Sequence, residues 1–221
     1  MSTSYQIRQC QRQGCGLRYP VVEGQPFSLH CPRCRGATEL VLERSLSQEA
    51  WEAPVQAAIE TPEAVGAEML HLEAMLDNIR SAWNVGSIFR SADGAGFSRL
   101  HLCGISPTPE NPSVGKTALG AEQSLSWGYA ADGVGMARRL LEEGCRLWAL
   151  EQEMRAEPLE AIHIPLLTGR LVLVVGNEVC GVDPGILALC ERVVYIPMRG
   201  GKRSLNVAVA FGIAAFALGG G

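Results

Sequence analysis

The apolar run from Leu171 to Val175 most constrains the fold of this chain, because five consecutive apolar residues leave no polar face for solvent. Such a run is typical of a parallel strand that is covered on both faces of a sheet. Strand-like and helix-like segments alternate around it from residue 70 onward, which predicts an α/β domain with mostly parallel strands. We expect strands at 70–76, 99–103, 145–150, 171–175 and 193–196, and helices at 84–95, 136–143 and 206–218.

The last of these helices, Asn206 to Leu218, is apolar on every side. A helix of this kind has no face for water, so we expect it to be buried all round, against its own core and against a second subunit.

Four cysteines near the N-terminus are spaced as two pairs. Cys10-x4-Cys15 and Cys31-x2-Cys34 are separated by 15 residues, and each pair lies in a glycine-rich turn. Two such turns supply the four thiolates that a tetrahedral zinc ion needs, and so small a segment would depend on the metal to fold. We therefore predict a zinc ribbon; the alternative is a set of reactive or disulfide-forming cysteines.

The charge changes sign along the chain, which helps to divide it. Residues 1–45 hold six Arg and three acidic residues, whereas residues 46–77 hold seven acidic residues and no basic one. Trp51, Val55 and Ile59 recur at helical spacing within this acidic stretch. We predict a zinc ribbon at 1–45, a helical acidic linker at 46–69 and the α/β domain at 70–221.

Composition limits the class of protein. Hydrophobic residues make up 47% and charged residues 19%, which excludes a disordered chain. The polar start, Met1 to Arg8, lacks the apolar segment of a secretory signal, and Cys103, Cys145, Cys180 and Cys190 have no ligand spacing. Reduced cysteines and a zinc ribbon fit the cytosol, so we expect a cytoplasmic protein that does not enter the membrane.

Several common enzyme motifs are incomplete or absent in this sequence. Gly115-Lys116-Thr117 ends like a phosphate-binding P-loop, but Glu110 stands where that loop needs its first glycine, so ATP hydrolysis is rejected. The chain also lacks the dinucleotide-binding glycine turn, the hydrolase nucleophile elbow and the zincin motif.

Three groups of polar residues and glycines remain, and each follows a predicted strand. They span Asp77 to Arg90, Gly176 to Asp183 and Ile196 to Asn206. Singly, each is explained by loop formation and helix capping. Jointly, they mark the carboxyl ends of the strands, where an α/β fold places its site.

The same three segments, in this order and spacing, resemble the SpoU/TrmH branch of the SPOUT RNA methyltransferases. Asn84-x-Gly86-x3-Arg90 matches the first motif of that family, and Gly176-Asn-Glu178-x2-Gly181 matches the second. Ile196-Pro197 with Ser204-Leu205-Asn206 matches the third. The resemblance covers residues 70–221 and leaves the ribbon outside.

The resemblance implies a parallel sheet whose C-terminal part forms a trefoil knot, and a homodimer with the cofactor site in the knot. It also implies transfer of a methyl group from S-adenosylmethionine to the 2′-oxygen of a ribose in tRNA or rRNA. The cofactor contacts carried over are Leu150, Gly176, Ile196 and Leu205.

Further roles follow from the same motifs. Arg90 matches the central catalytic residue, and we favour an electrostatic role because a guanidinium is deprotonated only above about pH 12. We expect Glu178 and Asn206 to orient Arg90 and the hydroxyl, with Asn84 shaping the pocket and Ser204 as a further catalytic candidate. The expected RNA contacts are Arg80, Arg199, Lys202 and Arg203.

The ribbon is expected to add RNA contacts, and the candidate side chains are Arg8, Arg12, Arg18, Arg33 and Arg35. Its alternative roles are to steady the dimer or to dock a protein. For the whole chain, two other functions stay open: a SPOUT enzyme that methylates a base, and an RNA-binding protein that has lost catalysis.

Overall fold

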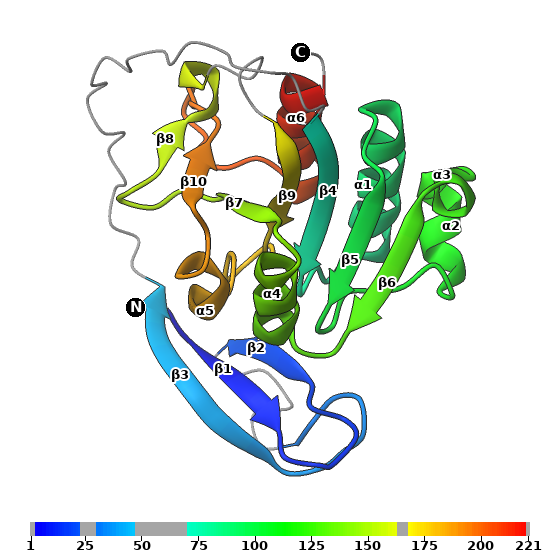
Figure 1. Cartoon of the computed structure of the whole chain (residues 1–221). Coiled ribbons are helices and arrows are strands. Elements are labelled where there is room, and N and C mark those ends of the chain that lie inside the picture. The colour runs from blue at the N-terminus through cyan, green and yellow to red at the C-terminus, as the bar shows by residue number, and fades with distance from the viewer. Residues whose placement is uncertain (1–2, 23–29, 47–69, 163–167, 220–221) are drawn as a thin grey trace.

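The computed structural model describes residues 3–22, 30–46, 70–162 and 168–219 and contains two sheets (Figure 1). The linker predicted at 46–69 falls almost entirely on residues 47–69, which lie outside the described residues.

The small sheet is formed by β1 (Thr3–Cys10), β2 (Arg18–Val22) and β3 (Thr38–Leu46), in the order β2-β1-β3 and fully antiparallel. Leu17, Tyr19 and Val21 pack with two of the cysteines into a core of only a few side chains. So small a core gives little stability by itself, which fits a segment held by a metal.

The large sheet has seven strands, in the order β6-β5-β4-β9-β7-β10-β8, and all its pairings are parallel. Five of its strands confirm the sequence prediction: β4 (Leu70–Asp77), β5 (Arg99–Cys103), β7 (Arg146–Leu150), β9 (Gly169–Val175) and β10 (Arg192–Tyr195). Two edge strands were not predicted, β6 (Ser126–Ala130) and β8 (Glu157–Pro158).

Helices cover both faces of the large sheet, as the apolar run of β9 predicts. On that strand Leu171 and Leu173 point to one hydrophobic core, and Val172 and Val174 to the other. The first core is covered by α1 (Ala82–Gly94), α2 (Pro112–Ala118), α3 (Ala121–Ser124) and α6 (Val207–Gly219). The second is covered by α4 (Gly133–Glu142) and α5 (Pro184–Leu187); a 3-10 turn, η1 (Leu159–Ala161), follows β8.

Two details of α1 and α6 bear on the site. The helix predicted to begin at residue 84 begins two residues earlier: Ser81 caps α1 by accepting a hydrogen bond from the Asn84 N–H, and Asn84 lies inside the first turn. In the single chain, α6 is buried on one side only: Phe211 is buried, whereas Val209 is 51% and Phe216 58% exposed. The trefoil knot stays a prediction.

The small sheet lies against the edge where β4, β5 and β6 end (Figure 1). None of the helices in the described ranges is long and apolar enough to cross a membrane.

Candidate functional site

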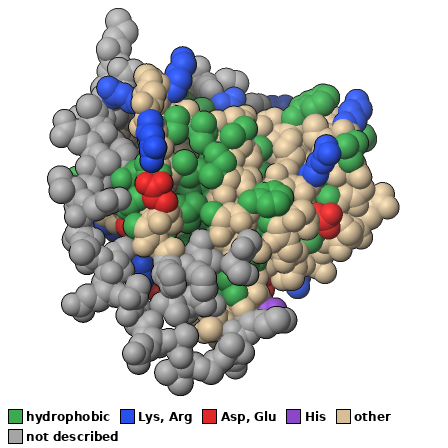
Figure 2. Space-filling model, turned by 90° about the horizontal axis from the view of Figure 1, so that it is seen from above, with side chains coloured by type: hydrophobic (Ala, Val, Ile, Leu, Met, Phe, Trp, Pro, Cys, Tyr) green, Lys and Arg blue, Asp and Glu red, His purple; other side chains and the backbone are tan. Residues whose placement is uncertain are grey.

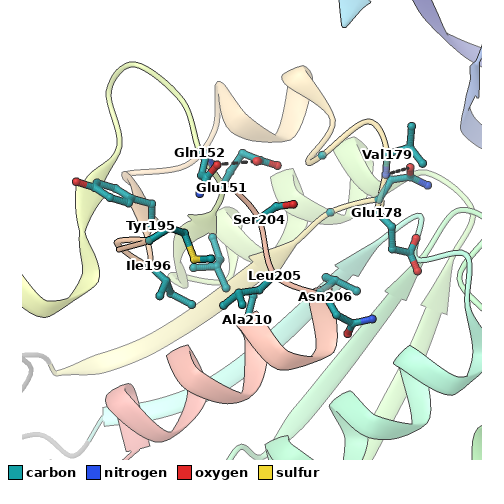
Figure 3. A pocket seen from close by; sticks show the side chains of 16 residues that line it. Glu151, Gln152, Glu178, Val179, Tyr195, Ile196, Ser204, Leu205, Asn206 and Ala210 are labelled. Atoms are coloured by element: carbon teal, nitrogen blue, oxygen red, sulfur yellow. Dashed lines mark hydrogen bonds between the residues drawn. The ribbon is translucent and has the colours of Figure 1, made fainter. Parts of the chain in front are cut away.

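A pocket of about 430 Å3 opens where β7, β9 and β10 end and α6 begins. Figure 3 shows Ile196 at one end of this pocket and Glu178 and Asn206 at the other. Its wall is built from loops that are far apart in the sequence, and its lining residues are Leu150–Gln152, Gly176–Val179, Gly181, Tyr195, Ile196, Met198, Ser204–Val207 and Ala210.

The pocket brings together most of the residues singled out in the sequence. The four expected cofactor contacts, Leu150, Gly176, Ile196 and Leu205, all lie in its wall. Three of the catalytic candidates, Glu178, Ser204 and Asn206, lie there too. Their roles stay predictions, but the fold brings these residues of separate motifs together around one cavity.

Side chains of all three motifs are joined by hydrogen bonds. The Asn84 amide donates to the Glu178 carboxylate over 2.9 Å, and the Asn206 amide donates to the Asn84 oxygen over 3.1 Å. The Asn206 oxygen in turn accepts from the Ala208 N–H and caps α6. Asn84 therefore links the N-terminal end of α1 to the N-terminal end of α6, although it does not line the pocket.

Glu178 is held as an anion. Burial alone would raise its pKa, but hydrogen bonds from the Arg80 N–H at 2.9 Å, from Asn84 and from the Ser81 N–H at 3.2 Å lower it below the usual value. The carboxylate thus closes the turn before α1, where free N–H groups favour negative charge.

The expected RNA-contacting cations are all exposed. Arg80 precedes α1, and Arg199, Lys202 and Arg203 lie in the loop between β10 and α6. Arg90 is exposed on α1, does not line the pocket, and forms no hydrogen bond or ion pair with another described residue. In the free chain Glu178 and Asn206 bond to Asn84 and not to Arg90, so the expectation that they orient Arg90 stays a prediction.

Two glycines of the second motif are required by close approach. A Cβ on Gly176 would lie 2.2 Å from the backbone of Gly181 and Val182. Gly181 has a φ of +72°, and a Cβ there would lie 2.3 Å from a Glu151 oxygen. The loop can fold back on itself only because both positions lack a side chain.

Glu151, which none of the sequence motifs includes, also lies in the pocket wall. Its carboxylate accepts hydrogen bonds from the Gln152 N–H at 2.8 Å and the Val182 N–H at 3.1 Å, and burial raises its pKa. The signal was available, since Glu151 directly follows β7, at the edge where a parallel sheet places its site.

A second, buried network lies beneath the pocket. Asp77 accepts from the Asn78 amide and from the Asp183 N–H, each at 2.8 Å, and the Asn177 amide donates to the Asn78 carbonyl at 2.7 Å. Burial, and secondarily the charge of Asp183, raises the pKa of Asp77 to about 7.

This network continues into the small sheet. The Arg18 guanidinium donates to both oxygens of Asp183, at 2.7 and 3.2 Å, and both side chains are nearly buried. The expectation that Arg18 contacts RNA is therefore wrong. Arg18 docks the ribbon on the α/β domain of its own chain.

The four patterned cysteines converge. The sulfur atoms of Cys10, Cys15, Cys31 and Cys34 lie within 4.8 Å of one another, with Cys10–Cys34 at 3.5 Å and Cys15–Cys31 at 3.8 Å. A tetrahedral zinc ion with bonds of about 2.3 Å separates its sulfurs by about 3.8 Å, so the four thiols fit this metal. A hydrogen bond from the Gly36 backbone, with the neighbouring thiols, lowers the pKa of Cys34 to about 6.

Fold and site together define an α/β protein with a pocket formed by loops at the carboxyl ends of parallel strands, without a glycine-rich nucleotide turn. The chain belongs to the SpoU rRNA Methylase family, whose model matches residues 71–216.

Curated relatives match the α/β domain. The chain is 31% identical over 142 residues to the 23S rRNA (guanosine-2'-O-)-methyltransferase RlmB of Vibrio vulnificus, covering 64% of this chain and 56% of that protein. The RlmB of Escherichia coli K12 is 32% identical, with 64% and 57% covered. The chain thus spans little more than half the length of these relatives.

Solved structures agree with the fold. A structure described as an AdoMet-bound rRNA methyltransferase from Sinorhizobium meliloti superposes with a TM-score of 0.62 at 26% identity, covering 67% of this chain and 55% of that one. A putative TrmH-family RNA methyltransferase from Porphyromonas gingivalis gives 0.61 at 27% identity, covering 71% and 61%.

Proposed function

We propose that this chain is an S-adenosylmethionine-dependent methyltransferase that modifies a ribose 2′-oxygen in rRNA or tRNA. The observation that carries the proposal is the set of hydrogen bonds joining Glu178, Asn84 and Asn206 beside a pocket lined by the family's second and third motifs. Relatives named as 23S rRNA guanosine-2′-O-methyltransferases support the same reaction.

The pocket fits the cofactor in size and chemistry. Its volume of about 430 Å3 is within the range of small-molecule sites. Leu150, Ile196 and Leu205 offer apolar contacts, and the Glu151 carboxylate suits a ligand that carries positive charge. When bound, S-adenosylmethionine supplies a methyl group on a sulfonium, which is electrophilic enough to transfer to an oxygen.

The residues of the chain orient the acceptor. Glu178 and Asn206 line the end of the pocket at the mouth of α1, where they bound the space for the ribose. Ser204 lies in the wall between Asn206 and the apolar part of the pocket and is the further catalytic candidate. Arg90 is the one motif cation on α1; it holds the adjacent phosphate and the negative charge that develops on the 2′-oxygen as its proton leaves.

RNA lies across the exposed cations near the pocket. Arg80 on one side and Arg199, Lys202 and Arg203 on the other are free to contact phosphates, and the 2′-hydroxyl distinguishes RNA from DNA.

The domain division predicted from the sequence is retained as a proposal: a ribbon at 1–45, a linker at 46–69 and the methyltransferase domain at 70–221. Zinc is the metal that we assign to the four cysteines, because four thiolates at tetrahedral spacing suit it. The compartment that we propose is the cytoplasm.

We also propose a homodimer formed through α6. Val209, Ile213 and Phe216 expose an apolar stripe on this helix, and Figure 2 shows hydrophobic side chains gathered on one face with Lys and Arg beside them. Sedimentation should give a dimer for the wild type and a monomer for Phe216→Asp; a monomeric wild type at micromolar concentration contradicts the proposal.

The function is tested by incubating the chain with total RNA and labelled S-adenosylmethionine and digesting the RNA to nucleosides for mass spectrometry. A 2′-O-methyl nucleoside is expected. A methylated base would identify a base methyltransferase, and RNA binding without any product would identify a catalytically silent protein; either result overturns the proposal.

A further inference from the structure

A second cavity, of about 530 Å3, lies between the ribbon and the α/β domain and is distinct from the cofactor pocket. The ribbon contributes Leu17, Pro32 and Arg33, and the domain contributes Gly104–Ser106, Thr108, Glu110, Trp127 and Tyr129. We call this cavity the ribbon cleft.

The ribbon cleft is preformed because the ribbon is fixed on the domain. Arg18 and Asp183 form a two-point ion pair with side-chain exposures of 11% and 2%, and the Arg18 N–H donates to the Ala131 carbonyl at 3.1 Å. Ile105 of the domain packs on the hydrophobic core of the ribbon. A ligand would therefore meet a cavity whose two walls are already in place, which reduces the ordering cost of binding.

The walls of the ribbon cleft have the chemistry that a nucleobase needs. The Arg33 guanidinium lies 5.2 Å from the centre of the Tyr129 ring, and Tyr129 is 37% exposed. Trp127 adds a second aromatic side chain, and Glu110 adds an acceptor for an amino group. Unpaired bases bind by stacking on aromatic rings and on guanidinium planes, with hydrogen bonds to their edges.

The ribbon cleft adjoins the loop between β4 and α1. The Ser106 hydroxyl accepts from the Ile79 N–H at 2.9 Å, and the Ile105 N–H donates to the Asn78 side chain at 3.1 Å. The next residue after Ile79 is Arg80, whose N–H binds Glu178. An RNA strand that passes Arg80 into the proposed active site therefore needs to cross only the loop between β4 and α1 to reach the ribbon cleft.

We propose that the ribbon cleft binds an unpaired nucleobase of the RNA substrate, on the strand that carries the methylated ribose. The inference rests on the proposed function and adds to it a second recognition site, at a distance from the reacting sugar. It assigns to Arg33 the role that the sequence analysis gave to five ribbon arginines together.

The first test is binding of a single-stranded RNA of about 12 nucleotides, followed by fluorescence anisotropy at two salt concentrations, to the full zinc-loaded chain. We expect Arg33→Ala to weaken binding about five- to tenfold, as loss of one stacking contact would. Arg33→Lys keeps the positive charge, so the salt dependence of binding should equal that of the wild type. It lacks the planar guanidinium, so its affinity for RNA should stay close to that of Arg33→Ala. Arg44→Ala, an exposed arginine on β3 that does not line the ribbon cleft, is the matched control and should change affinity less than twofold.

The second test places 4-thiouridine in the same RNA and maps ultraviolet cross-links by mass spectrometry. Cross-links at Trp127 or Tyr129 are expected. The proposal is overturned if Arg33→Ala binds RNA as tightly as Arg44→Ala does, which is the result expected if the ribbon cleft binds a protein instead. It is also overturned if cross-links occur only at Arg80 and residues 199–203.

The two proposals fail separately. If methyl transfer occurs and does not depend on Arg33, the proposed role of the ribbon cleft is refuted and the proposed enzyme activity is retained. If RNA binding depends on Arg33 but no methyl group is transferred, the enzyme activity is refuted and the role of the ribbon cleft is retained. Calorimetry with S-adenosylmethionine should give the same affinity for all variants, because Arg33 does not line the cofactor pocket.

Discussion

The carboxylate of Glu178 and the guanidinium of Arg90 have opposite surroundings. Glu178 accepts hydrogen bonds from two backbone N–H groups and from the Asn84 amide, so its charge is used to hold the loop before α1. Arg90 is exposed and makes no such bond with the described residues. Its charge is therefore not paired with another described side chain, which agrees with the role that we propose for it on a phosphate and a developing alkoxide.

Replacing Arg90 by Ala should abolish methyl transfer while leaving affinity for S-adenosylmethionine near normal, since Arg90 does not line the pocket. Loss of one preorganised charge in a reaction of this type costs about two to three orders of magnitude in rate. Single-turnover transfer of labelled methyl groups and calorimetry with the cofactor measure the two effects. Arg138→Ala, an exposed arginine on α4, is the control; an Arg90→Ala enzyme as active as this control would refute the role.

At the residue scale, the sequence predicted which residues line the pocket but not the hydrogen bonds that hold its charged group. Gly176, Ile196 and Leu205 were found because their motifs occur in a fixed order. The pairing of Glu178 with Asn84 was not found, because it joins a loop residue to a residue of α1 that is 94 positions away in the chain.

At the level of elements, three neighbouring strands are joined by one buried carboxylate. Glu73 on β4 bonds to the His101 Nε2 on β5 at 2.7 Å and to the Arg170 guanidinium on β9 at 2.8 Å. The hydrogen bond with His101, and after it the ion pair with Arg170, lowers the pKa of Glu73 to about 2 against the opposing effect of burial.

This arrangement makes the stability of the sheet depend on pH. Because the pKa of Glu73 is lower in the folded chain, its contribution is present above pH 4.5 and is lost as the pH falls toward 2. We expect Glu73→Gln to lower the free energy of unfolding by about 2–3 kcal/mol at pH 7, and the difference from wild type to shrink below pH 4.5.

Urea unfolding at a series of pH values measures this effect. Glu191→Gln is the matched control, since Glu191 pairs with Arg146 at the surface and its loss should cost at most about 1 kcal/mol. A constant difference between wild type and Glu73→Gln from pH 7 to pH 3 would contradict the assignment.

The elements that could be predicted are those whose pattern is local. Leu171 to Val175 is apolar throughout and forms the strand that it predicts. The segment of β6, Ser126 to Ala130, mixes polar residues, glycine and two aromatics, and it forms a strand only because β5 lies beside it. The sequence could not say which residues of α6 face the core, because the helix is apolar on every side; in the single chain Val209, Ile213 and Phe216 are the exposed ones.

At the level of the whole molecule, the ribbon is bonded to the loops at the edge of the large sheet that carries the pocket. Its contact runs from Arg18 through Asp183 and Asp77 to Asn78 and Asn177, which precedes Glu178. No local pattern predicts this contact, because its partners come together only when both sheets have formed.

Removing the metal should unfold the ribbon and leave the large sheet intact. The core of the ribbon is too small to fold without the four-cysteine site, whereas β4 and β9 lie in a separate, larger core. After chelation, hydrogen exchange measured by mass spectrometry should rise in β1–β3 and change little in β4 and β9. Metal-free protein that keeps β1–β3 protected would show that the cysteines are not a structural site.

The Arg18–Asp183 pair also bears on how the protein is made. The two residues are 165 positions apart, and a ribosome adding roughly 5–20 residues each second needs on the order of 10–30 s to travel between them. Arg18 thus leaves the ribosome well before Asp183, the residue that anchors the ribbon on the α/β domain. In that interval the four-cysteine site has to stay together without this contact to the rest of the polypeptide.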